Sequence, residues 1–93
     1  MAPISDLPAL SLYRRPGCGL CDEARTLLQA LLDRRAAAGL AAPPIEERDI
    51  DTDPAWQRAY FTTIPVVELG ERRLETVTSA AALRRLLDEG LGT

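Results

Sequence analysis

Cys18 and Cys21 are the only cysteines of this 93-residue chain, and they are separated by Gly19 and Leu20. The residues before the pair predict a strand, and the residues after it predict a long helix. A thiol at the start of a helix lies at the positive end of the helix dipole, which favours the thiolate. A second thiol one turn later can attack a mixed disulfide that the first has formed. The pair therefore predicts thiol–disulfide exchange, with Cys18 and Cys21 as the catalytic residues.

Other kinds of chemistry are limited by the residue types that the chain lacks. It contains no histidine, which excludes a Cys–His nucleophile pair, a Ser-His-Asp triad and a Cys₂His₂ zinc site within one chain. Its carboxylates show no paired acid/base pattern. Two alternatives to redox exchange stay open. One is a binding module without catalysis, and the other is a dimer that holds a metal or an iron–sulfur cluster through four shared thiolates.

Composition predicts one globular domain that spans residues 1–93, with 46% hydrophobic residues and a net charge of −3. No large basic field invites nucleic acid. Residues 1–12 have neither a basic start nor a long apolar run, and no stretch is apolar enough to span a membrane. We therefore expect a cytoplasmic monomer without nucleic-acid or membrane partners.

The predicted elements alternate between strands and helices before ending in a hairpin and a helix. A helix over 21–38 joins strands over 9–14 and 45–51, so these two strands are expected to be parallel. Asp53 and Ser79 are predicted to cap two further helices. Gly70-Glu71 turns a strand over 64–69 into one over 72–77. This β-α-β-α-β-β-α order predicts an α/β fold, a mixed four-stranded sheet with helices on both faces.

Two sequence segments carry a resemblance to a known family. They are the stretch Leu10-Ser-Leu-Tyr-Arg-Arg-Pro-Gly-Cys-Gly-Leu-Cys-Asp-Glu-Ala24 and the tripeptide Thr63-Ile64-Pro65 before the third strand. Over about residues 9–90 the chain resembles the small glutaredoxin-like proteins of bacteria, which belong to the thioredoxin-fold superfamily. The resemblance implies a thioredoxin-like fold with strand order 2-1-3-4.

The resemblance also implies roles for individual residues. Cys18 matches the exposed attacking cysteine, and Cys21 matches the more buried resolving one. Pro65 matches the family's cis-proline, and Ile64 matches the residue whose backbone amide and carbonyl pair with bound substrate. Arg14 and Arg15 lie near a basic position that helps to anchor glutathione. The substrate-binding residues implied are therefore Arg14, Arg15, Ile64 and Pro65, and the partners are disulfide-containing proteins and a cellular reductant.

The chain departs from glutaredoxins at two places. Gly19-Leu20 stands where glutaredoxins usually have Pro-Tyr. Residues 75–80, Glu-Thr-Val-Thr-Ser-Ala, stand where glutaredoxins have a Gly-Gly pair and a following acidic residue that hold glutathione. We therefore expect no tightly bound cofactor, and glutathione is expected to be a poor specific ligand. The predicted function is a dithiol–disulfide oxidoreductase of cell redox homeostasis that reduces protein or small-molecule disulfides.

Overall fold

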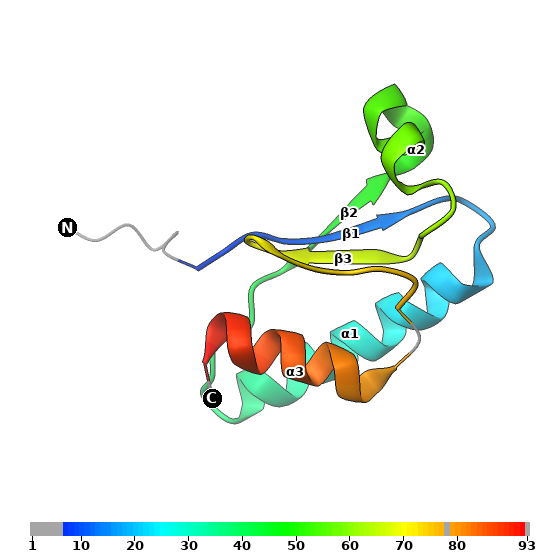
Figure 1. The fold of residues 1–93 in the computed structure, drawn as a ribbon. Coiled ribbons are helices and arrows are strands. Elements are labelled where there is room, and N and C mark those ends of the chain that lie inside the picture. The colour runs from blue at the N-terminus through cyan, green and yellow to red at the C-terminus, as the bar shows by residue number, and fades with distance from the viewer. Residues whose placement is uncertain (1–6, 78, 93) are drawn as a thin grey trace.

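A four-stranded sheet carries two helices on one face and a third helix on the other (Figure 1). The computed structural model describes residues 7–77 and 79–92. The elements are β1 (Leu10–Arg14), α1 (Gly19–Ala37), β2 (Ile45–Asp49), a short 3-10 helix η2 (Ile50–Thr52), α2 (Pro54–Tyr60), β3 (Val66–Leu69), β4 (Arg72–Leu74) and α3 (Ala80–Leu91).

The strands lie in the order β2-β1-β3-β4. β1 pairs with β2 in parallel, because α1 carries the chain back to the start of the sheet before β2 begins. β3 is antiparallel to both β1 and β4. The predicted thioredoxin-like fold and its strand order are confirmed. β2, the strand with most charges, lies at an edge, where its polar side chains remain in water.

The alternation of side chains along β1 divides the core into two clusters. Leu10 and Leu12 are completely buried among the leucines of α1 and α3. Tyr13 points to the opposite face, where it packs with Tyr60 of α2. Successive residues of a strand point to opposite faces, so one short strand contributes to both clusters. α1 and α3 therefore cover one face, and α2 covers the other (Figure 1).

The bounds of several elements differ from those predicted. α1 begins at Gly19, two residues earlier than expected, because Cys18 caps it. The second strand ends at Asp49, where the backbone tightens into η2. The third strand begins at Val66, and the fourth ends at Leu74, so both are shorter than predicted. Asp53 and Ser79 cap α2 and α3 as expected, each through a side-chain oxygen that accepts a backbone N–H.

Arg35 joins the C-terminal ends of α1 and α3. Its side chain is only 6% exposed. The guanidinium donates to the carbonyl oxygens of Ala41 and Gly92, at 2.6 Å in each case, and to Asp88 at 2.9 Å. A buried charge needs partners of this kind. The opposite end of α1, where the cysteines lie, is held separately by the end of β1.

Candidate redox site

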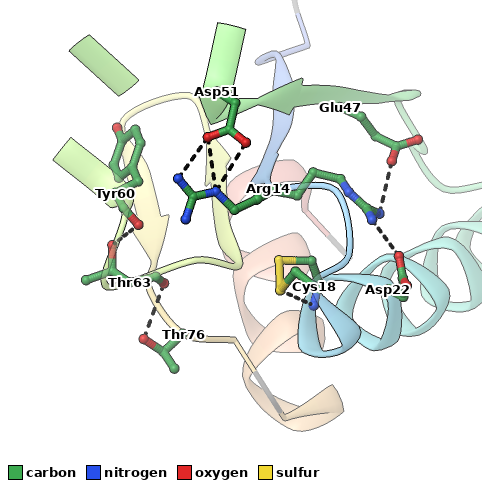
Figure 2. The surroundings of a disulfide bond; sticks show 10 residues. Arg14, Cys18, Asp22, Glu47, Asp51, Tyr60, Thr63 and Thr76 are labelled. Carbon is green, nitrogen blue, oxygen red and sulfur yellow. Dashed lines mark hydrogen bonds and ion pairs between the residues drawn. A yellow bond between two sulfur atoms is a disulfide. The ribbon is translucent and has the colours of Figure 1, made fainter. Parts of the chain in front are cut away.

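Cys18 is the N-cap of α1, and its sulfur atom lies at the start of the first helical turn. The Sγ atom accepts the N–H of Cys21 at 3.1 Å, and it is joined to the Sγ atom of Cys21 in a disulfide (Figure 2). The Cα atoms of the two residues are 5.2 Å apart. Cys18 is partly exposed, whereas Cys21 is completely buried. The two sulfurs thus differ in access although they are in covalent contact.

The turn before Cys18 explains how the sulfur reaches this position. Gly17 has a φ of +78°, a backbone conformation that glycine adopts without a steric penalty. The N–H of Cys18 donates to the carbonyl of Arg15 at 3.3 Å, which closes the turn. β1 therefore ends, and α1 begins, within four residues. This short connection fixes the cysteine pair at the C-terminal end of β1.

The Ile64–Pro65 peptide bond is cis, as the resemblance implies. Pro65 is buried, and its carbonyl oxygen accepts the N–H of Val77 at 3.0 Å. The carbonyl of Thr63 accepts the N–H of Thr76 at 2.7 Å, and Figure 2 shows this pair among the residues around the disulfide. The loop that carries Pro65 is therefore fastened to the segment that precedes α3.

The backbone of Ile64 offers less for substrate pairing than expected. Its N–H already donates to the carbonyl of Tyr60 at 3.1 Å, which completes the last turn of α2. The amide that the resemblance assigns to substrate pairing is therefore already bonded within the protein, at the end of this helix. Among the described residues, no hydrogen bond engages the Ile64 carbonyl. Pairing of that carbonyl with a substrate, and contact of Pro65 with a substrate, stay predictions.

Arg14 is paired with two carboxylates beside the cysteines. Its guanidinium bonds to Asp22 of α1 and, at 3.4 Å, to Glu47 of β2 (Figure 2). Asp22 also lies one helical turn from Cys18, and its N–H donates to the Cys18 carbonyl at 3.1 Å. Glu47 in turn accepts from Arg25 at 2.9 Å. The positive charge of Arg14 is therefore balanced within the protein.

Arg15 is balanced in the same way by Asp51 of η2. Two guanidinium nitrogens donate to this carboxylate, at 2.8 and 3.0 Å. The hydrogen bond from Arg15 is the main reason that the pKa of Asp51 lies below its ordinary value. Both arginines thus occur near the cysteines, as predicted, but each is committed to a carboxylate. A role for Arg14 or Arg15 in anchoring an anion stays a prediction.

Comparison with known proteins agrees with this geometry. The family model of the Glutaredoxin-like domain (DUF836) matches residues 9–89. The chain belongs to this family. The X-ray structure of the protein XcR50 from X. campestris is 34% identical, covers 87% of this chain and 97% of its own, and has a TM-score of 0.69. The protein Ne2328 from Nitrosomonas europaea is 25% identical over 81% of each chain, with a TM-score of 0.58. Family membership and the cysteine pair together indicate a redox-type function.

A second polar cluster of this glutaredoxin-like domain was missed by the sequence analysis. The hydroxyls of Tyr13 and Tyr60 both donate to Glu68, each at 3.1 Å, and Arg73 donates to the same carboxylate at 3.1 Å. The pKa of each tyrosine is raised, first by burial and then by the nearby Glu68. No local spacing signals this cluster, because its members come from β1, α2, β3 and β4.

The described residues, 7–77 and 79–92, offer few sites of other kinds. They contain no group of three or more acidic, cysteine or histidine side chains placed to hold a metal ion. None of their helices combines the length and the apolar character that a bilayer span requires.

Proposed function

We propose that this protein is a dithiol–disulfide oxidoreductase that uses Cys18 as the attacking thiolate and Cys21 as the resolving thiol. The observation that carries the proposal is the asymmetry of the pair. Cys18 is partly exposed at the helix N-terminus, whereas Cys21 is completely buried within disulfide reach of it. An external disulfide can thus meet one sulfur only, and the second sulfur is already in place for the next step.

The reaction proceeds by two exchanges. The Cys18 thiolate attacks one sulfur of a substrate disulfide, forms a Cys18–substrate disulfide and releases the other substrate sulfur as a thiolate. The Cys21 thiolate then attacks Cys18 Sγ, which forms the Cys18–Cys21 disulfide and releases the second substrate thiolate. Two electrons pass from the protein dithiol to the substrate, which leaves as two thiols after protonation. A dithiol reductant reverses both exchanges on the protein and restores the starting state.

The first turn of α1 favours the first step. The backbone N–H of Cys21 points at Cys18 Sγ, and a donor in this position stabilises a negative sulfur. The same helix end supplies the positive pole of the dipole. Asp22 opposes this effect from one turn away, but Arg14 is bonded to that carboxylate and offsets its charge. Glu23 opposes the effect as well, and no arginine of the described residues offsets that charge. The N–H of Cys21 and the helix dipole therefore favour the thiolate against this one unpaired carboxylate.

A protein dithiol suits the site better than glutathione as reductant. Glutaredoxins hold glutathione through a Gly-Gly pair and an acidic residue that follows it. Residues 75–80 here contain no glycine, and their one acidic residue, Glu75, comes first in the segment. Both nearby arginines are already paired with carboxylates. Loss of one charge-assisted hydrogen bond costs about 1.5–3 kcal/mol, or roughly 10- to 150-fold in affinity. We therefore propose a thioredoxin-type reductant and no tightly bound cofactor.

The burial of Cys21 also separates this proposal from metal binding. A cluster shared by two chains needs both cysteines of each chain at the interface. Cys21 has no exposed surface, so that arrangement requires the first turn of α1 to open. Thiol exchange needs no such change, because Cys21 attacks a sulfur that it already touches. The geometry therefore favours redox exchange over the shared cluster.

The two cysteines serve as matched controls in the test. Cys18→Ser is expected to abolish reduction of a peptide disulfide, because no accessible thiol remains. Cys21→Ser is expected to accumulate a mixed disulfide between Cys18 and one half of the peptide, which intact-mass spectrometry detects. Limiting alkylation of the reduced protein should label Cys18 first. Preferential labelling of Cys21, or full activity in Cys18→Ser, would overturn the assignment. Partner binding that survives Cys18→Ser in a protein without reductase activity would indicate a binding module instead.

A further inference from the structure

A groove of about 510 Å³ lies between the first turns of α1 and Val77 in the segment before α3, and its lining begins at Asp22, the residue after Cys21. Its apolar lining comes from Ala24, Leu27 and Val77, and Asp22, Glu23 and Thr26 form its polar part. Val77 is fastened to the carbonyl of Pro65, and Asp22 lies one turn from Cys18. The groove is therefore bounded by the start of α1, which carries the cysteines, and by Val77, which is bonded to the cis-proline loop.

The charge of the groove is negative and concentrated at Glu23. Asp22 is bonded to Arg14, and Asp51 and Glu47 are likewise paired with arginines. Glu23 is exposed and forms no ion pair with any residue in the described part of the chain. Near the cysteines, Glu23 thus carries a carboxylate charge that the protein itself does not balance. A ligand with a positive charge at this place would supply the missing partner.

We propose that this groove docks the polypeptide that flanks the reacting half-cystine of a protein disulfide, and that it selects an apolar residue followed by a basic residue. This inference rests on the proposed function and names its substrate class. Glu23 lies five positions after Cys18, and in helical geometry this places their Cα atoms roughly 8–9 Å apart. An extended peptide covers that distance in about two or three residues. The apolar side chain meets Leu27 and Val77, and the basic side chain, two or three residues from the half-cystine, meets Glu23.

The same features disfavour glutathione as an occupant. Glutathione carries two carboxylates and one amine, so its net charge has the same sign as that of Glu23, and it has no apolar side chain for the floor of the groove. Like charges repel across an exposed site, and the effect decreases as salt screens it. An apolar, basic peptide segment is the occupant that matches both the lining and the charge.

Three disulfide-linked peptides test the proposal on the reduced full-length protein. All three carry leucine beside the half-cystine. They differ at one position only, two residues from the half-cystine, which is arginine, serine or glutamate. We expect the arginine peptide to be reduced roughly threefold to tenfold faster than the glutamate peptide at low salt, in kcat/KM, and about equally fast at high salt. Replacement of the leucine by serine should slow the arginine peptide.

Two charge-neutralising variants locate the effect. Glu23→Gln is expected to reduce the arginine preference to below about twofold. Glu71→Gln removes the same charge in the turn between β3 and β4, at the end of β3 far from Pro65, and should keep the preference of the wild type. The serine peptide has no charge at the varied position, so its reduction tests the oxidoreductase proposal separately from the charge preference of the groove. If none of the three peptides is reduced, the oxidoreductase proposal fails.

Other outcomes would overturn the inference while the proposed function stands. These are equal reduction of all three peptides at low salt, the same loss of preference in both glutamate variants, or oxidised glutathione reduced faster than the arginine peptide. Sedimentation of the wild type as a dimer that Glu23→Gln dissociates would assign the groove to a second copy of the chain and would equally overturn it.

Discussion

Replacement of Arg35 by methionine measures how much the hydrogen bonds of Arg35, at the C-terminal ends of α1 and α3, contribute to the free energy of unfolding. The guanidinium makes three hydrogen bonds, to Ala41, Asp88 and Gly92, and it is almost fully buried. Hydrogen bonds to a charged group contribute about 1.5–3 kcal/mol each, so the three set an upper bound of roughly 4–9 kcal/mol. Methionine removes the charge and the donors but keeps most of the buried volume.

The net loss is smaller than this bound for two reasons. Gly92 is exposed and Asp88 is partly exposed, so water replaces part of the lost bonding. A buried methionine also avoids the desolvation of a charge and returns about 1–2 kcal/mol of apolar burial. We therefore expect Arg35→Met to lower the free energy of unfolding by about 2–3 kcal/mol, which lowers Tm by roughly 8–24 °C for a domain of this size.

Urea and thermal unfolding, followed by far-ultraviolet circular dichroism, measure this change. Arg34→Met is the matched control, because Arg34 is an exposed neighbour in the same helix and its replacement changes the charge equally. The control should stay within about 0.5 kcal/mol of the wild type. Equal stability of the two variants would refute the reasoning, since it would show that the three bonds of Arg35 contribute nothing beyond its charge.

Two further predictions concern the tyrosine cluster and the reductant. Burial and Glu68 raise the pKa values of Tyr13 and Tyr60 above their ordinary value of 10.0, so the folded protein keeps phenol protons that the unfolded chain releases. The free energy of unfolding should therefore fall as the pH rises above about 10, and Tyr60→Phe should weaken that fall. If the slope of the unfolding free energy against pH were the same in Tyr60→Phe, the role assigned to the tyrosine–Glu68 cluster would be wrong. In a glutathione-coupled assay the protein should turn over slowly, and a thioredoxin-type system should reduce it faster. Saturation at low glutathione would contradict this.

Much of the local structure can be predicted from neighbouring residues. Leu10, Leu12 and Tyr13 alternate between two environments, and the structure places them on opposite faces of β1 as the period of two requires. Asp53 and Ser79 mark helix starts because their side chains accept N–H groups that the first turn leaves free. The Cys18–Cys21 spacing brings both sulfurs to the first turn of a helix. Each of these features depends on residues a few positions apart.

Contacts between distant segments decide the rest of the site. The resemblance places Arg14 and Arg15 near a position that helps to anchor glutathione. In the structure the parallel pairing of β1 and β2 brings Glu47 to Arg14, and η2 brings Asp51 to Arg15. The amide of Ile64 is used by the end of α2, a result that depends on where that helix stops.

The sequence by itself determined the cysteine pair, its place between a strand and a helix, and the order of the elements, because these follow from residue types and short periods. Only the tertiary structure decided which carboxylate each arginine meets, which backbone groups remain available, and that Val77 and Leu27 line a groove beside Asp22 and Glu23. Glu47 and Asp51 are 33 and 36 residues away from the arginines they meet, and Val77 is likewise distant in sequence from Leu27. They meet because burial of the leucine core packs α1 and α3 against the sheet, and no local pattern encodes that meeting.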